Sequence, residues 1–347
     1  NKEEKFCFHL RSKPLFFRLD PDYECPVKKV KLEVSRSLLY EQLKRDKDPI
    51  GRIEAAQSLV AKASQADIKV LSQRLKKETQ WGVANRIAKA LGKIGGEFAR
   101  DGLLKAVNSR EAKIRRGIVQ ALGEFMGDEK VTRILKKIAG GDPSYRVEAE
   151  ALSSLGRIKA KNCRPFLEGF LDRPSHNDIG RSAIFKALAS LEEEEAWATL
   201  LQGANYGAPR SSRFSAIQGL AKLAGRFEYL KPEAINAFKR FARETRGTPC
   251  ATFRGKLAAI HAMGELEDLS AVPTLRQLAE GETDGRLKRR AEETIGRLFD
   301  SAKKPKEMKV IRSDLDDLML ENKSLRDRMD IMEKQKDAKL KSKKKKG

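Results

Sequence analysis

The sequence has little of several residue types on which whole classes of protein depend. Its 347 residues include three His and four Cys, and aromatic residues make up only 6%. His9, His176 and His261 lie far apart and none is followed by Glu, so we expect no metal ion or other cofactor in this chain. The cysteines form no CxxC pair and are too widely spaced for a disulfide framework. This usage favours a reducing, cytoplasmic setting.

Long apolar runs are also missing. No stretch approaches the roughly 20 residues that cross a bilayer. The first residues, NKEEKFCFHL, carry too much charge for a secretory signal. We therefore expect no contact with a membrane. Residue 1 is Asn rather than Met, which indicates that further sequence lies upstream.

Positive charge, in contrast, is abundant. There are 72 Lys and Arg against 49 Asp and Glu, a formal net charge of +23. The end of the chain contributes to this excess, with 16 basic and 9 acidic residues from Ser301 onward. Residues 335–347 are rich in Lys, and like charges that repel one another predict a disordered tail there. The low aromatic content and the lack of a known reader motif argue against nucleic acid as a partner.

A repeat dominates the sequence between residues 34 and 299. Eight large apolar residues recur at intervals of 31 to 33 residues, apart from one interval of 43. Small residues flank them on both sides, and mostly apolar residues stand four positions before and three positions after. This spacing traces one face of an α-helix, and the small neighbours allow another helix to approach closely. We call the eight residues anchors: Leu59, Leu91, Leu122, Leu155, Leu188, Leu220, Met263 and Ile295.

Each anchor helix is preceded by a second amphipathic segment, such as IKVLSQRLKKE or VTRILKKIAG. Eleven residues before each anchor lies a position at which a helix is expected to begin, as at Asp48 before Pro49. Each unit is therefore a helix pair joined by a tight turn, and a pair can bury its apolar face only by stacking on the next pair. The pattern resembles HEAT repeats over residues 34–299. It implies a mainly α fold, a right-handed α-solenoid of about eight repeats.

The two ends of the chain do not repeat. In residues 1–33 short apolar–polar alternations are broken by prolines, which predicts the terminal strands of an upstream β-sandwich. After a linker at 300–306, residues 307–334 predict a coiled-coil helix. Its core positions are Met308, Ile311, Leu315, Leu318, Asn322, Leu325, Met329 and Met332. A homodimer through 308–332 is one interpretation, and a helix that folds back on the solenoid is the other.

The junction between the N-terminal segment and the first repeat resembles the corresponding junction in aminopeptidase N-like zinc metallopeptidases. The matching residues are Phe17, Arg18, Asp20, Pro21, Lys28, Lys29, Leu39, Gln42, Leu43, Asp48, Gly51, Arg52, Ile53, Ala55 and Ala56. The resemblance implies a C-terminal HEAT-like domain that shapes the access of peptide substrates. Zinc and the catalytic residues would then belong to an upstream catalytic domain, because this chain has no HExxH motif.

A large subunit of a transcription factor associated with the TATA-binding protein shares this architecture without being a peptidase. The alternative hypothesis is therefore a non-catalytic HEAT-repeat scaffold that binds a protein partner. Nucleic acid is the weakest of the partners that we consider.

Seven residues before the anchors, six of the eight positions are basic. This basic ladder consists of Arg52, Arg115, Arg181, Arg213, Lys256 and Lys288. Its functional interpretation is a surface that binds carboxylates or an acidic partner. In the structural interpretation each side chain packs between adjacent repeats and pairs with an acid or a carbonyl there. The long interval between Leu220 and Met263 predicts a loop at 245–252, either a binding surface or a tolerated insertion.

Overall fold

The computed structural model describes residues 9–18, 20–21, 24, 34–245, 249–303 and 318. These residues form sixteen α-helices and three short 3-10 turns, and they contain no β-strand. The helices follow one another as eight pairs, so the mainly α solenoid expected from the repeat is confirmed. The chain divides into two compact units, 1–124 and 125–347, which we call unit 1 and unit 2.

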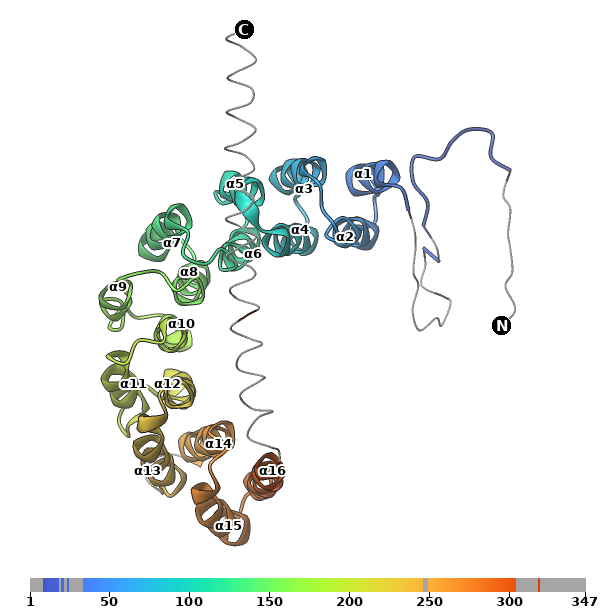
Figure 1. Ribbon diagram of the computed structural model, residues 1–347. Coiled ribbons are helices and arrows are strands. Elements are labelled where there is room, and N and C mark those ends of the chain that lie inside the picture. Colours follow the sequence, from blue (N-terminus) through green and yellow to red (C-terminus); the bar gives the residue numbers. More distant parts are fainter. Residues whose placement is uncertain are drawn as a thin grey trace. The chain divides into compact units, whose positions relative to one another are not determined.

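Unit 1 contains three helix pairs. Figure 1 shows the odd-numbered helices of this unit in one row and the even-numbered helices in the other. The helices are α1 (Arg36–Arg45), α2 (Pro49–Ser58), α3 (Gln65–Lys77), α4 (Trp81–Ile94), α5 (Gly96–Ala106) and α6 (Ala112–Leu122).

Unit 2 contains five pairs in the same two-row arrangement (Figure 1). The first of its helices are α7 (Glu129–Gly141), α8 (Tyr145–Arg157), α9 (Arg164–Glu168), α10 (Ile179–Leu191) and α11 (Ala196–Ala204). The others are α12 (Arg210–Arg226), α13 (Lys231–Ala242), α14 (Pro249–Glu265), α15 (Val272–Gly281) and α16 (Gly285–Ala302).

The anchors form the core between the two rows. Seven of the eight are fully buried, and Ile295, in the last pair, is half-buried. The small residue after the anchor is what allows the helices to meet. A methyl group on Gly156 of α8 would lie 2.4 Å from the Cα atom of Ala187 in α10. Stacking of the pairs therefore depends on the absence of a side chain at this position.

Most helix starts agree with the prediction. Asp48 and Asp284 cap α2 and α16, and each accepts a hydrogen bond from the backbone two residues on. Two predicted starts were wrong. The α10 helix begins at Ile179, two residues after Asn177, and Thr252 lies inside α14. In the first case both Asn177 and Asp178 have positive φ, so regular helical geometry begins only after them, at Ile179.

The predicted loop at 245–252 is also only partly correct. Residues 246–248 lie outside the described part, but α14 already begins at Pro249. The extra length of this interval is taken up by helix, because α12 and α14 have 17 residues each whereas α8 and α10 have 13.

The N-terminal strands are not found where the chain is described. Residues 9–18 are irregular, and the remaining predicted strand positions lie outside the described residues. Arg18 explains how this segment is held without a sheet, because its guanidinium lies 2.5 Å from Asp48 and 3.8 Å from Asp46 in the turn between α1 and α2. Among the predicted coiled-coil positions only Leu318 is described, as a helical residue with 60% exposure.

Candidate functional site

The basic ladder lies in the first turn of the even-numbered helices, except for Lys256 near the middle of α14. Its two most buried members point back to the turn before their helix. Arg52 Nη1 donates to the carbonyls of Asp46 and Lys47, at 2.8 and 3.1 Å. Arg213 Nε donates to the carbonyl of Ala204 at 2.6 Å. These carbonyls end the preceding helix or turn, where backbone acceptors need partners. Part of the ladder thus satisfies backbone groups inside the chain.

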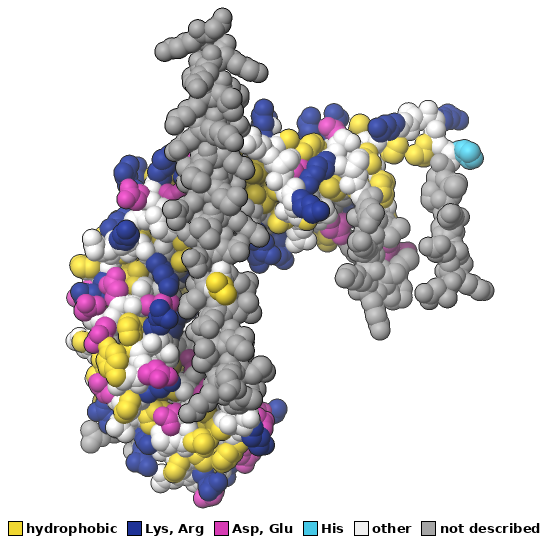
Figure 2. All heavy atoms as spheres, in the orientation of Figure 1, with side chains coloured by type: hydrophobic (Ala, Val, Ile, Leu, Met, Phe, Trp, Pro, Cys, Tyr) yellow, Lys and Arg dark blue, Asp and Glu magenta, His cyan; other side chains and the backbone are white. Residues whose placement is uncertain are grey.

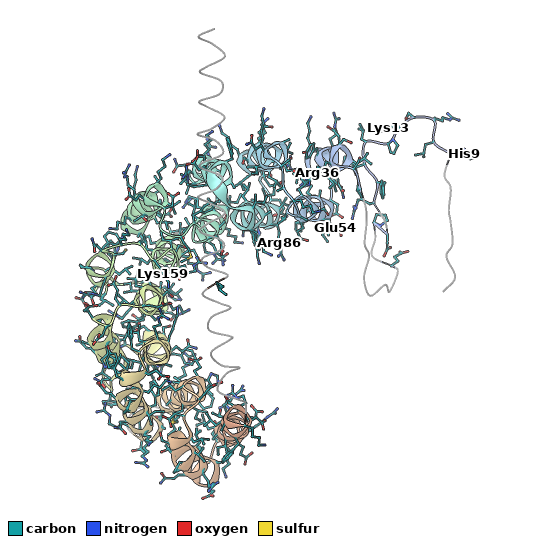
Figure 3. All side chains as sticks on the ribbon, in the orientation of Figure 1. His9, Lys13, Arg36, Glu54, Arg86 and Lys159 are labelled. Carbon is teal, nitrogen blue, oxygen red and sulfur yellow. The ribbon has the colours of Figure 1, made fainter. Side chains whose placement is uncertain are left out.

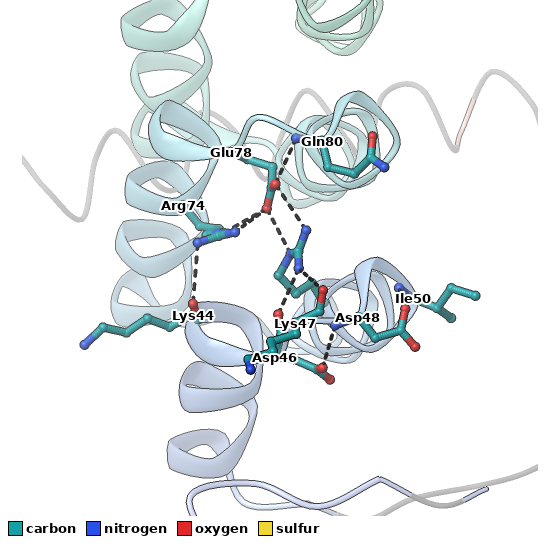
Figure 4. A network of polar contacts seen from close by, with 9 residues as sticks. Lys44, Asp46, Lys47, Asp48, Ile50, Arg74, Glu78 and Gln80 are labelled. Carbon is teal, nitrogen blue, oxygen red and sulfur yellow. Dashed lines mark hydrogen bonds and ion pairs between the residues drawn. The ribbon is translucent and has the colours of Figure 1, made fainter. Parts of the chain in front are cut away.

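Arg52 also reaches the next repeat. Its Nε lies 3.1 Å from Glu78 Oε2 at the end of α3, and Arg74 Nη2 approaches the same oxygen at 2.6 Å. Gln80 donates its backbone N–H to the other oxygen of Glu78, so this carboxylate joins three partners, as Figure 4 shows. Burial raises the pKa of Glu78, but the N–H of Gln80 and the two arginines lower it more, and its pKa lies below the ordinary value.

Unit 2 repeats this ion pair between adjacent repeats. Arg213 Nη2 lies 2.6 Å from Glu244, and Lys256 Nζ lies 2.5 Å from Glu282. We call these contacts, with that between Arg52 and Glu78, the inter-repeat ion pairs. In every one of the three, a ladder residue of an even-numbered helix meets a carboxylate just after the following odd-numbered helix; Arg52 and Arg213 lie in the first turn of their helices, whereas Lys256 lies near the middle of α14.

The fourth inter-repeat ion pair has its charges reversed. Glu148 occupies the ladder position in α8, where six of the eight repeats carry a base. Its partner is Arg173, with Nη2 at 2.9 Å. The contact between a ladder position and the segment after the next odd-numbered helix therefore accepts either order of charges, provided that the two charges are opposite.

The remaining ladder residues differ in their contacts. Arg115 donates to the carbonyls of Ser109 and Arg110, both at 2.9 Å. Arg181 bonds the carbonyl of Leu171 and the carboxylate of Asp178. Lys288 is half-buried and has no ion-pair partner within the described chain. The structural interpretation accounts for these contacts, whereas the use of the ladder as a ligand surface stays a prediction.

Two large pKa shifts have causes in the packing. Asp67 is fully buried; burial raises its pKa, but hydrogen bonds from Ser64, Tyr40 and Arg36 lower it to about 2. Burial raises the pKa of Cys163 to about 11. A thiol with so high a pKa is a poor nucleophile, and an acid held by three donors is a structural anion.

A different surface appears on helices α4 and α6 of unit 1. Trp81, Asn85 and Lys89 follow one another at intervals of four residues and so share one side of α4. Trp81 is 46% exposed. Lys113 of α6 lies over its ring, with Nζ 5.0 Å from the centroid.

Asn85 fits against Gly117 of α6, where a methyl group would lie 1.9 Å from its Oδ1 atom. That Oδ1 atom is buried and has no hydrogen-bond partner among the described residues. The amide nitrogen of Asn85 makes no hydrogen bond with a described residue. Unlike the oxygen it is not buried, so it is open to solvent. The glycine thus fixes an amide that has one end buried and the other exposed.

Exposed cations surround these residues. Arg86, Lys89, Lys93 and Arg116 are all exposed, and none forms an ion pair with a described residue. Arg86 projects from the side of α4 that faces away from α3 (Figure 3). Figure 2 shows many dark-blue and few magenta side chains over the helices of unit 1. We call Trp81, Asn85, Arg86, Lys89, Lys93, Lys113, Arg116 and Gly117 the α4–α6 face.

The sequence prediction missed this face because it followed positions relative to the buried anchors. The signal was nevertheless available. Trp81 is one of only two tryptophans in the chain, and its spacing to Asn85 and Lys89 is that of a helix face.

Unit 2 has hollows along its turns. One of about 580 Å³ is lined by Arg181 and Tyr206 among others, and one of about 310 Å³ by Arg213, Arg243 and Thr245. Two ladder residues line these hollows, but the charges of both are compensated by nearby carboxylates.

Two other kinds of site are absent from the described residues. They contain no group of three or more His, Cys, Asp or Glu side chains that could hold a metal ion. None of the described helices has the length and apolar character needed to cross a bilayer.

Comparison with known proteins identifies a repeat family. The HEAT-repeat family matches residues 36–123, 68–147, 100–185 and 132–221. Phycocyanobilin lyase subunit alpha of Picosynechococcus sp. PCC 7002 is 29% identical over 147 residues, which are 39% of this chain and 54% of that protein. The chain thus spans about half the length of this curated relative.

Solved structures of similar helical repeats include three from different organisms. The complex of CpcE and CpcF of phycocyanin lyase from Nostoc sp. PCC7120 has 19% sequence identity and a TM-score of 0.44, and the match covers 79% of this chain and 98% of that one. YibA of Escherichia coli has 17% sequence identity and a TM-score of 0.45, and the match covers 78% of this chain and 100% of that one. Human deoxyhypusine hydroxylase in complex with glycerol has 18% sequence identity and a TM-score of 0.34, and the match covers 76% of this chain and 96% of that one.

These findings correct the resemblance to aminopeptidase N-like peptidases, which was wrong. The family match begins at residue 36 and the curated relative is a lyase subunit, not a peptidase. The residues shared with the peptidase junction have general roles in a helix repeat: Asp48 caps α2, Arg52 makes an inter-repeat ion pair, and Ala55 and Ala56 are core. The role in peptide access is overturned together with the resemblance. The expectation of zinc in an upstream domain was based on that resemblance alone and is not tested by these findings.

Proposed function

Because this chain belongs to the HEAT-repeat family, we propose that it is a non-catalytic scaffold whose even-numbered helices bind a protein partner. The observation that carries the proposal is the α4–α6 face. It combines an exposed tryptophan with four cations that have no ion pair within the described chain. Tryptophan and arginine are enriched in protein interfaces, where they supply contact area and directed hydrogen bonds.

The groups with shifted pKa support a structural role for the rest of the chain. Asp67 and Glu78 bind donors of their own or the neighbouring repeat, and Cys163 is buried. Shifted groups often mark active sites, but the shifts of these three groups follow from burial and from hydrogen bonds within the chain. The curated relative is by its name a subunit, which agrees with a chain that works in an assembly.

Site-specific photo-crosslinking tests this proposal. A benzophenone amino acid is introduced at Lys89 on the α4–α6 face and, as a control, at Lys77 on α3, in cells that produce the protein. We expect discrete protein adducts from position 89 and far fewer from position 77. Adducts with nucleic acid, or equal yields from both positions, would contradict the proposal.

The finer organisation also belongs to this proposal. We propose a right-handed solenoid at 34–299, a linker at 300–306, a coiled-coil helix at 307–334 and a Lys-rich tail at 335–347. Homodimerisation through 308–332 would present two solenoids to one partner. Light scattering after size exclusion, on the chain with and without residues 301–347, tests it. A monomer in both cases rules out the dimer.

A further inference from the structure

We propose that the α4–α6 face binds an extended, acidic polypeptide segment, with Trp81 and Asn85 as the specific contacts and the surrounding cations as the electrostatic ones. The inference deepens the proposed function and rests on it. It names the ligand class and the residues that recognise it.

Asn85 is the residue that points to a polypeptide backbone. Its acceptor oxygen is buried without a hydrogen-bond partner, and leaving a buried polar atom unpaired destabilises the folded chain. An apolar residue in this notch over Gly117 would avoid the loss. An amide in this place is useful to a ligand that offers both a donor and an acceptor, and a peptide group offers both. The exposed nitrogen donates to a carbonyl of the segment, and rotation of the side chain out of the notch over Gly117 would bring its oxygen to the N–H of the same peptide unit.

Trp81 supplies the apolar part of the site. Its ring remains 46% exposed although Lys113 lies over it. A large exposed apolar side chain costs free energy in water that an interface recovers. Because Trp81 lies one turn before Asn85, a segment bonded to the amide also reaches the ring. The ring contacts the backbone and the aliphatic parts of such a segment.

The cations determine the charge of the ligand. Arg86, Lys89, Lys93 and Arg116 are exposed and unpaired within the described chain, whereas Arg52 and Arg74 of the same unit are bound to Glu78. From Trp81 to Lys93 the helix rises by about 18 Å, which matches about five residues of extended chain. A segment of this length with several Asp or Glu side chains meets a cation at each end.

Tryptophan fluorescence tests the proposal in the full chain. Trp197 is buried and bonds Glu233, so the Trp197→Phe chain has Trp81 as its single reporter. The probe is a 15-residue peptide of Glu, Asp, Ser and Gly, and its control replaces every Glu and Asp by Gln and Asn. We expect a saturable change in emission with the acidic peptide, weakened by salt, and none with the neutral one.

Variants separate specific from general attraction. We expect Asn85→Ala to weaken binding about fivefold to tenfold, corresponding to one lost hydrogen-bonded contact. Lys89→Glu combined with Arg116→Glu, both exposed and harmless to folding, should weaken it at least tenfold. Lys77→Gln, on α3, should change it less than twofold. Trp81→Phe, which keeps only the Trp197 reporter, should abolish the fluorescence change.

Three outcomes overturn the inference: no saturable change, equal binding of the neutral peptide, or binding that ignores Asn85→Ala and the double charge reversal. Tighter binding of a duplex DNA than of the peptide, insensitive to Asn85→Ala, also overturns it. If the peptide fails while photo-crosslinking at position 89 still yields protein adducts, the ligand class is wrong and the scaffold function stands. If both fail, the proposed function fails too.

Discussion

Unit 1 and unit 2 share one repeat pattern but carry their charges differently. Residues 34–124 of unit 1 hold 19 Lys and Arg against 10 Asp and Glu, and the described residues of unit 2 hold 29 against 24. In unit 1 the arginines Arg36, Arg45, Arg52, Arg74 and Arg100 form ion pairs, and no lysine does so with a described residue. The net charge of unit 1 is thus carried mainly by unpaired lysines.

The comparison teaches that folding and recognition use different positions of the same helices. The anchors, the small residues beside them and the inter-repeat ion pairs recur in both units. The α4–α6 face has no equivalent tryptophan–asparagine pair elsewhere, because the only other tryptophan, Trp197, lies in an odd-numbered helix and is buried. The repeat thus determines the fold, and under the proposal above it is the departures from the repeat that determine what a unit binds.

The largest expected effect comes from removing the carboxylate shared in unit 1. Glu78→Ala leaves Arg52 buried without its acid, and we expect a loss of about 3–4 kcal/mol in the free energy of unfolding. Glu244→Ala in unit 2 also leaves a buried arginine, Arg213, without its acid, but it removes no contact of a second arginine, so the loss should be smaller, about 2–3 kcal/mol. Urea denaturation monitored by hydrogen exchange of each unit measures both. Equal losses would remove the distinction between a shared and a simple pair.

The glycine after the anchor gives the next effect. Gly156→Ala brings a methyl group 2.4 Å from Ala187, so we expect a loss of about 3 kcal/mol. At the equivalent Gly92 of unit 1 the nearest atom, Ala121 O, is 3.0 Å away, and about 1 kcal/mol is expected. Thermal unfolding of the two variants tests this order. A larger loss for Gly92→Ala would contradict the helix spacing described above.

Acid should destabilise unit 1 through Asp67. Hydrogen bonds lower its pKa from 3.8 to about 2, so the folded state favours the charged form. The stabilisation, about 2 kcal/mol, is complete above pH 4 and is lost as the pH falls from about 4 to about 2. Asp67→Asn removes this pH dependence and lowers stability at pH 7. Urea midpoints at several pH values measure it, and an unchanged slope in the variant would disprove the assignment.

The smallest effect is a gain. Gly296 also follows an anchor, in α16, but no atom lies within 4 Å of a methyl group placed there. Gly296→Ala should therefore stabilise unit 2 by about 0.5–1 kcal/mol, because alanine favours helix over glycine. Calorimetry of this variant beside Gly156→Ala shows whether a neighbouring helix is what makes the glycine necessary.

Much of the fold could be predicted from the sequence because the anchors repeat. The spacing of Leu59, Leu91 and Leu122 placed the helices of unit 1, and the burial of these residues agrees with it. The start of α14 could not be predicted in this way, because an extra turn of helix leaves the periodicity of the anchor face intact. The α4–α6 face was not predicted for a different reason. Exposed residues need not follow the period of the repeat, and this Trp–Asn pair occurs in one repeat alone.

The reversed pair of Glu148 and Arg173 has a consequence for how the chain can be assembled. If α8 were stacked on the segment after α13, Glu148 would meet Glu244 instead of Arg173. If α12 were stacked on the segment after α9, Arg213 would meet Arg173. Like charges brought together at a partly buried contact oppose both exchanges. One inverted pair therefore gives the repeats of α8 and α12 a preferred neighbour. It opposes arrangements in which these otherwise similar helices exchange places.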